Sequence, residues 1–361
     1  TRQLYRDILR RRPILAATEP SPRTAGWTAA ASPSEDVALV GREDEIARLR
    51  TWVAKVSSGS CQVAFLVGET GAGKSRLVAA LAAEALAAEP ERGAGSVRVV
   101  VGRCHEGEQI LAFGPWIDAF RAARLPEDRA LLDTLEPIWR AELVRLLPEL
   151  RGSEVNVSSD PPDAPRLFEG VRQLVGCLVN RSPVVLILED LHWADEMSLR
   201  LLQFLARRAS GWPLLLVGTV REEELPDLPL LRHTLDSLEG EPQVERLRVA
   251  PLSRRATVRL VRALSSARSE PAALDRLGRQ VWRASEGNPF VVVETMRALQ
   301  QGIALVGPEG LPPFSTLRRI RATDQQGIAL VGPEGLPLAE RVRQVIARRL
   351  ERLSEVAREL A

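Results

Sequence analysis

The feature that most constrains this chain is the glycine-rich segment GETGAGKS at residues 68–75. It fits the pattern G-x-x-x-x-G-K-[ST], in which glycines let the backbone curl so that successive N–H groups point at one anion. The flanks fit as well, because the apolar run 63–67 predicts a buried strand and residues 76–89 predict a helix that ends before Pro90. A strand, a glycine loop and a helix in this order predict a phosphate-binding loop (P-loop) at a helix N-terminus.

The side chains of the loop predict how a nucleotide would be held. We expect Lys74 to place its charge on the β- and γ-phosphates and the Ser75 hydroxyl to bind Mg²⁺. Lysine occurs only at positions 55 and 74 among 49 basic residues, so its presence here indicates that a compact ammonium is needed. A chance match of a glycine-rich turn is the alternative, and the matching flanks disfavour it. The residues expected to bind ATP or ADP are Gly68, Glu69, Thr70, Gly71, Ala72, Gly73, Lys74, Ser75 and Arg76.

A second apolar run, residues 183–188, ends in two carboxylates, Glu189 and Asp190. Such a run is typical of a central parallel strand, and ligands of α/β sheets bind at the carboxyl ends of the strands. We expect one carboxylate to bind Mg²⁺ and the other to orient or deprotonate the attacking water. Consecutive strand residues face opposite sides of a sheet, so the two roles should differ, and their assignment stays open. The alternative is that acidic residues simply end this strand.

Strands and helices alternate along most of the chain, which predicts an α/β fold with a parallel sheet flanked by helices. A helical pattern from 253 to 300, punctuated at 286–289, predicts a helical lid subdomain. The segment QQGIALVGPEGLP occurs at 300–312 and again at 325–337, which indicates a recent duplication or an artefact. The predicted divisions are the end of a preceding helical domain at 1–12, a linker at 13–36, a P-loop ATPase core at 37–250, the lid at 251–300, the duplicated Gly-Pro segment at 301–337 and the start of another domain at 338–361.

Composition excludes several other classes of protein. The formal net charge is only +2, so nothing in it demands nucleic acid or an anionic membrane as a partner. No apolar stretch approaches the roughly 18 residues of a membrane span. Three cysteines without a C-x-x-C pair argue against a disulfide framework or a zinc site. We expect a cytoplasmic protein with no membrane partner.

Five segments in a fixed order resemble a known family. They are VGRE at 40–43, the P-loop, LEDLHWAD at 188–195, VGTVR at 217–221 and EGNPF at 286–290. Together they resemble the signal-transduction ATPases with numerous domains (STAND), a branch of the AAA+-like P-loop NTPases. The strongest likeness is to the ATPase modules of large bacterial transcriptional regulators. The resemblance covers residues 37–299, and residues 1–13 and 338–361 resemble parts of the activator and winged-helix domains that flank such modules.

The resemblance implies further site residues. Val40, Gly41 and Arg42 would lie near adenine and ribose, the alternative being a solvated turn. Arg221 would sense the γ-phosphate, and Pro289 would contact the base, although a proline there also suits a plain helix start. His192 and Trp193 would serve as positioning or packing groups. The catalytic set is then Glu189, Asp190, Lys74 and Arg221, with Ser75, Glu189 and Asp190 as the metal ligands.

The function expected from this resemblance is that of a slow ATPase acting as a regulatory switch in a bacterial signal-responsive transcriptional regulator. ATP binding would close the lid and promote self-association, and DNA would be bound only through flanking domains. Two alternatives stay open. One is an origin-recognition-like AAA+ ATPase that itself binds DNA, and the other is a scaffold that holds ADP without turnover.

Overall fold

The computed structural model describes residues 39–88, 96–151, 164–265 and 271–300. The segments predicted at 1–12, 13–36, 301–337 and 338–361 lie outside these residues. Within the described part of the chain, no helix is both long enough and apolar enough to cross a membrane.

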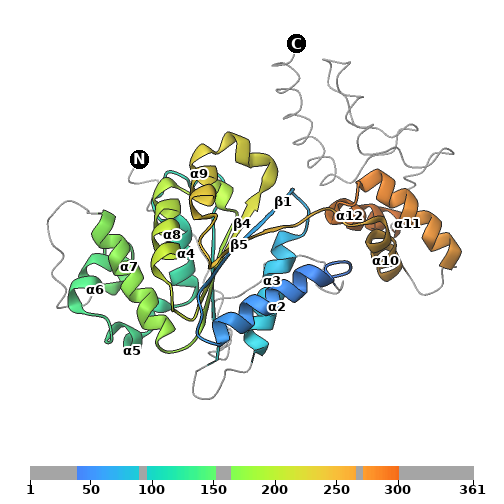
Figure 1. Cartoon of the computed structure of the whole chain (residues 1–361). Helices are drawn as coiled ribbons and strands as arrows, with labels where there is room; N and C mark the ends of the chain where they lie inside the picture. The colour runs from blue at the N-terminus through green and yellow to red at the C-terminus, as the bar shows by residue number, and fades with distance from the viewer. Residues whose placement is uncertain (1–38, 89–95, 152–163, 266–270, 301–361) are drawn as a thin grey trace, which may run out of the picture.

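A five-stranded parallel sheet forms the centre of the larger unit (Figure 1). In spatial order its strands are β2 (Arg98–Arg103), β3 (Val184–Glu189), β4 (Leu214–Arg221), β1 (Gln62–Gly68) and β5 (Val244–Arg248). The strands are parallel because a helix follows each of the first four and returns the chain to the same starting edge. All residues of β1 and β3 are buried, as expected of strands covered on both faces. The predicted α/β fold class is confirmed.

Helices cover both faces of this sheet. One apolar core lies under α2 (Glu43–Ser57) and α3 (Lys74–Ala87), and its buried side chains include Leu49, Leu77 and Leu81. The other core lies under α4 (Gly114–Ala122), α7 (Ala164–Val179), α8 (Glu196–Arg208) and α9 (Pro229–Leu238). Figure 1 shows these two layers on opposite sides of the strands. The P-loop therefore begins from a strand that cannot shift without disturbing both cores.

The connection from β2 to β3 is a series of short helices. Four of them have proline at their first or second position, which fits proline's fixed φ and missing N–H. The prolines therefore divide this stretch into short helical pieces. The shorter elements here are η1 (Leu125–Glu127), α5 (Arg129–Leu132), α6 (Pro137–Leu143) and η2 (Pro148–Leu150).

Two elements differ from the sequence prediction. The β-branched run at 96–101 predicts a strand there, whereas strand β2 lies two residues later, because its pairing with β3 sets Arg98 opposite Val184 and Arg103 opposite Glu189. Helix α9 was not predicted at all. Its signals were present, since a proline begins it and Leu231, Leu235 and Leu238 recur on one face and are buried.

Three further helices form a separate unit beside the sheet. They are α10 (Arg254–Leu264), α11 (Pro271–Ser285) and α12 (Pro289–Gln300), and Figure 1 shows them at the end of the chain leading from β5. Leu252, Leu260, Val281 and Val292 are among the side chains of their own small core. The sequence predicts a helical lid over the same range, and this three-helix unit is called the lid below.

Asp195, the last residue of the LEDLHWAD segment, joins two helices of the larger core. It is buried, and its Oδ1 accepts hydrogen bonds from the backbone N–H of Ser198 (2.9 Å) and of Phe113 (3.1 Å). Its Oδ2 accepts one from the Ser198 hydroxyl. Asp195 therefore caps α8 and anchors the residue that precedes α4.

We predict that Asp195→Ala lowers the free energy of unfolding by about 2–4 kcal/mol, because a cap is lost and buried donors are left without an acceptor. Asp195→Asn, which keeps one acceptor oxygen, should cost less. Ser253→Ala removes the exposed cap of α10 and should cost only about 1 kcal/mol. Chemical denaturation of the three variants measures this order, and equal losses for Asp195→Ala and Ser253→Ala would contradict the role given to Asp195.

Candidate functional site

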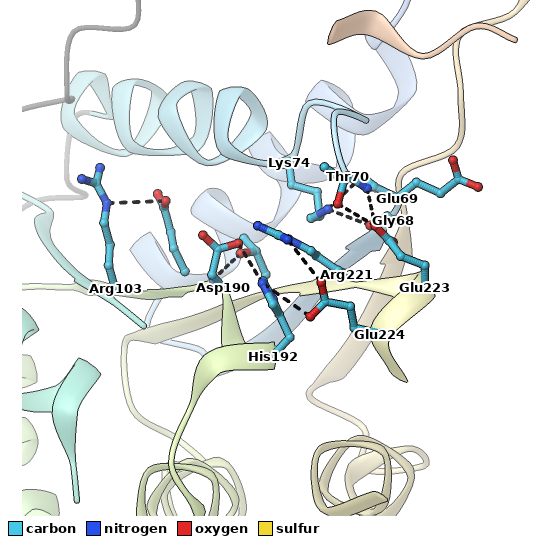
Figure 2. Close-up of polar contacts among 12 residues, drawn as sticks. Gly68, Glu69, Thr70, Lys74, Arg103, Asp190, His192, Arg221, Glu223 and Glu224 are labelled. Carbon is cyan, nitrogen blue, oxygen red and sulfur yellow. Dashed lines mark hydrogen bonds and ion pairs between the residues drawn. The ribbon is translucent and has the colours of Figure 1, made fainter. Parts of the chain in front are cut away.

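The P-loop connects the end of β1 to the start of α3. Gly71 and Gly73 have φ of 82° and 97°, a conformation that favours glycine. The Lys74 ammonium turns back over the loop and donates hydrogen bonds to the carbonyl oxygens of Gly68 (2.7 Å) and Glu69 (3.0 Å), as Figure 2 shows. Burial lowers the pKa of Lys74, and the Glu223 carboxylate opposes that shift. The predicted loop thus has the backbone and the cation that a phosphate site requires.

Oxygen donors for Mg²⁺ lie in the first turn of α3 and at the end of β3. Ser75 is exposed in that turn, while Glu189 and Asp190 end the neighbouring segment. No group of three His, Cys, Asp or Glu side chains within the described ranges could hold a metal alone. This donor set fits Mg²⁺, which binds through one or two protein oxygens together with substrate phosphates and water.

Glu189 is the last residue of β3 and is buried. Its Oε2 lies 3.6 Å from Nε of Arg103, the residue beside it on β2. Burial raises the pKa of Glu189, Arg103 opposes the shift, and the neighbouring Asp190 adds to it. A buried carboxylate with a raised pKa can accept a proton from water, provided that water reaches it.

Asp190 does not continue the strand. It has φ of 59° and ψ of 48°, and its N–H donates to the Thr219 hydroxyl of β4 (2.8 Å). We expected the two carboxylates to differ because consecutive strand residues face opposite sides of a sheet. That reason was wrong, since Asp190 lies in a left-handed turn after the strand and this turn sets its direction. The charge of Asp190 opposes the lowering of the Lys74 pKa that burial causes, whereas Glu189 is paired with Arg103. The two carboxylates consequently have different surroundings.

Arg221, the predicted sensor, is the last residue of β4 and pairs with Gly68 in the sheet. Its Nη1 donates to Glu224 Oε1 (3.2 Å). The fully buried His192 lies between two carboxylates, with Nε2 3.9 Å from Asp190 Oδ1 and 4.0 Å from Glu224 Oε2. Figure 2 shows Asp190, His192, Arg221 and Glu224 gathered beside Lys74. Parallel pairing of β4 with both β1 and β3 brings these residues to one edge of the sheet.

The lid contacts the P-loop directly. The Asn288 side-chain amide donates to the Thr70 carbonyl oxygen (2.9 Å), and the Phe290 N–H donates to that of Gly71 (3.3 Å). Asn288 Oδ1 also accepts from the N–H groups of Phe290 (3.1 Å) and Val291 (3.4 Å), so it caps α12. Pro289 is the first residue of that helix. A Cβ on Gly71 would lie 2.7 Å from Asn288 Oδ1, so glycine is needed here for space as well as conformation.

The segment 40–42 lies between the lid and the P-loop. Arg42 is buried and donates from Nη2 to the Ala72 carbonyl oxygen (2.8 Å) and from Nη1 to Glu45 (2.6 Å). The alternative of a solvated Arg42 is therefore wrong. Gly41 has φ of 77°, and a Cβ there would lie 2.3 Å from that of Ala256 in α10. Val40 packs against the core of the lid.

Other residues at the site were missed by the sequence analysis. Glu223 accepts hydrogen bonds from the N–H (2.9 Å) and the hydroxyl (2.6 Å) of Thr70. Only its position two residues after Arg221 could have drawn attention to it. Asn288 had a clearer signal, since an asparagine before a proline is typical of a helix start. By contrast, Arg76 in the first turn of α3 is among the predicted site residues, and burial lowers its pKa. The further missed residues are Arg103, Thr219 and Glu224.

Comparisons with known proteins give one family and several distant structures. No curated protein matches the chain. The ORC1 protein of Aeropyrum pernix in complex with DNA is 16% identical, with a TM-score of 0.45 over 79% of this chain and 71% of that one. The ORC2 protein of Aeropyrum pernix (ADPNP-ADP complexes) is 13% identical, with a TM-score of 0.47 over 82% and 71%. A RuvB variant of Thermotoga maritima is 13% identical, with a TM-score of 0.42 over 81% and 79%.

The family match is to the sequence segment that contains most of the site. Residues 38–217 match the family described as AAA ATPase domain. This range includes the P-loop, the carboxylates Glu189 and Asp190 at the end of β3, and the segment around Arg42. The chain therefore carries an AAA ATPase domain.

Proposed function

We propose that this protein binds and hydrolyses ATP as a regulatory switch whose lid responds to the nucleotide. The observation that supports this most is the pair of hydrogen bonds from Asn288 and Phe290 to the carbonyl oxygens of Thr70 and Gly71. These two contacts join the lid to the loop that receives phosphate.

The geometry of a peptide unit explains why this contact matters. In a trans peptide the C=O and the following N–H point in opposite directions. The C=O of Thr70 shares its peptide plane with the N–H of Gly71, and that of Gly71 shares its plane with the N–H of Ala72. A phosphate that turns these N–H groups toward itself also turns the carbonyl oxygens that the lid binds. Phosphate binding and lid position would thus be coupled through the plane between Thr70 and Gly71, and through the plane between Gly71 and Ala72 once the Ala72 N–H leaves the Glu69 carbonyl oxygen (3.1 Å).

Hydrolysis requires in-line attack of water on the γ-phosphate. Lys74 and Arg221 would neutralise charge on the transferred phosphoryl group. Of Glu189 and Asp190, one would hold the metal and the other would orient or deprotonate water. Bound Mg²⁺, held by Ser75 and one carboxylate, would supply charge neutralisation between the β- and γ-phosphates. Turnover should be slow, so that hydrolysis resets the switch.

The wider role follows from the sequence resemblance. The VGRE, LEDLHWAD and EGNPF segments support a STAND-class module of a bacterial signal-responsive transcriptional regulator. In such a module ATP would change which surfaces are available for self-association. DNA would be bound by flanking domains.

Lysine substitution tests nucleotide binding. Lys74→Ala should weaken ATP binding at least about 100-fold, because an ammonium that faces the phosphates in a poorly solvated site is lost. The matched control is Lys55→Ala, the only other lysine, which donates to the Gln62 side chain (2.9 Å) in an exposed position. Titration calorimetry with Mg²⁺ measures both affinities. Unchanged affinity in Lys74→Ala would refute the phosphate site.

The two carboxylates are distinguished by separate variants. Glu189→Gln and Asp190→Asn should each lower phosphate release by about 100-fold or more, the size of effect that a general base supplies. The variant that lost the metal ligand should also need more Mg²⁺ for ATP binding, whereas the variant that lost the base should bind Mg²⁺ and ATP as before. Phosphate release equal to that of the unaltered protein in both variants would rule out the proposed hydrolysis by Glu189 and Asp190.

The lid contact is tested by Asn288→Ala. ATP should change the hydrogen exchange of α10–α12 in the unaltered protein, and this change should be lost in the variant while ATP still binds. Ser253→Ala is the control, because it also removes a cap from a lid helix but leaves the P-loop contact intact. A response of the lid to ATP that survives in Asn288→Ala would show that the coupling runs elsewhere.

A further inference from the structure

Glu223 holds a carboxylate against the P-loop. One oxygen, Oε1, accepts two hydrogen bonds from Thr70, from the N–H at 2.9 Å and from the hydroxyl at 2.6 Å. Figure 2 shows the side chain directed from the end of β4 toward Thr70 and the loop. The two residues are 153 positions apart in the chain. A side-chain anion is therefore bound by backbone and hydroxyl donors of the loop that is built to bind phosphate.

The contact is that of a charged group. Burial alone would raise the pKa of Glu223, but the hydrogen bonds from Thr70 and the charge of Lys74 outweigh it and lower the pKa. Glu223 is thus an anion at neutral pH. Its second oxygen, Oε2, is buried and accepts no hydrogen bond. A carboxylate with only one of two oxygens satisfied is held less firmly than a fully hydrogen-bonded one.

The position of Glu223 relates it to the third phosphate. Figure 2 shows Glu223, Arg221, Asp190 and Glu224 beside Lys74 at one end of the loop. After burial, the charges of these four groups are the further causes that act on the pKa of Lys74. This end adjoins the carboxyl ends of β3 and β4, where the γ-phosphate has to meet the carboxylates and Arg221. A phosphoryl group placed there would be repelled by Glu223 and would compete with it for the same donors.

We propose that Glu223 is a specificity-determining residue that selects against the third phosphate. ADP binds while Glu223 stays on Thr70, whereas ATP binds only when Glu223 leaves. This inference rests on the proposed binding of ATP at the P-loop. It adds a cost that ATP carries and ADP does not, so the affinity ratio of the two nucleotides is set by this carboxylate.

The departure of Glu223 would also release the sensor. Glu223 and Glu224 are adjacent in the short 3-10 helix η4 (Glu222–Asp227), and Glu224 accepts the hydrogen bond from Arg221. A movement of η4 as a whole that removes Glu223 from Thr70 would also draw Glu224 away from Arg221. The guanidinium then becomes available to the γ-phosphate. One displacement would remove the carboxylates of Glu223 and Glu224 from Thr70 and Arg221, and a phosphoryl group would take their place.

The test is the ratio of ATP to ADP affinity in Glu223→Gln. The amide keeps an acceptor for Thr70 but removes the charge, so ATP binding should tighten about tenfold or more while ADP binding changes less than about threefold. Glu222→Gln is the matched control, because Glu222 lies in the same 3-10 helix and its partner is the exposed Arg248 at 3.0 Å; its ratio should stay unchanged. Arg221→Ala should shift the ratio in the opposite direction. Glu223→Ala provides a second variant that removes the carboxylate entirely and should change the ratio in the same direction as Glu223→Gln.

The outcomes separate this inference from the proposed function. If the unaltered protein binds both nucleotides and neither Glu223 variant changes their ratio, the inference is overturned and the proposed function stands. Equal weakening of both nucleotides would also overturn it, since Glu223 would then only shape the loop. If Glu223→Gln binds ATP and the unaltered protein does not, the inference is supported. If neither the unaltered protein nor any variant binds either nucleotide, the proposed function fails and the inference fails with it.

Discussion

The structure depends on how the peptide planes of the P-loop are held. Each plane has an N–H end available to an anion and a C=O end that must find a donor. Arg42 binds the carbonyl oxygen of Ala72, Asn288 that of Thr70, and Lys74 those of Gly68 and Glu69. These donors come from α3, from the lid and from the turn before α2. The carbonyl ends of the loop are thus fixed by three separate parts of the chain, while the N–H of Thr70 donates to Glu223 and that of Ala72 donates to the Glu69 carbonyl oxygen.

The sheet puts the remaining groups within reach of this loop. Because all five strands are parallel, the residues that end β1, β3 and β4 meet at one edge. Strand order alone therefore brings Gly68, Glu189 and Arg221 to this edge, with Gly68 opposite Arg221 and with β4 between β1 and β3. The turn at Asp190 adds a second carboxylate on the Lys74 side, and Thr219 fixes that turn through the Asp190 N–H. Burial of Leu186, Ile187 and Leu188 leaves this edge little freedom to move.

Much of this site could be predicted from the sequence, because the P-loop and the β3 carboxylates depend on local patterns. A glycine with positive φ, a lysine and a serine at fixed spacing specify the loop by themselves. Glu223 and Asn288 could not be placed in the same way, since their contacts with Thr70 span 153 and 218 residues. Such contacts depend on strand order and lid packing, which local periodicity does not contain. The left-handed turn at Asp190 was missed for a different reason, because nothing in its neighbours requires the strand to end there.

The balance of charge around Lys74 explains why such a site needs both a metal and a movable carboxylate. Four carboxylates, Glu189, Asp190, Glu223 and Glu224, lie at this end of the site among the cations Lys74, Arg221 and Arg103, while Arg42 binds the Ala72 carbonyl oxygen and Arg76 lies in the first turn of α3. A triphosphate that binds here would be repelled by these carboxylates. In the proposed function, bound Mg²⁺ would remove part of that repulsion, and displacement of Glu223 would remove another part. The diphosphate has less charge to place, so it would depend less on the second step. Such a site would distinguish the two nucleotides by charge, through a side chain that occupies the loop before the third phosphate does.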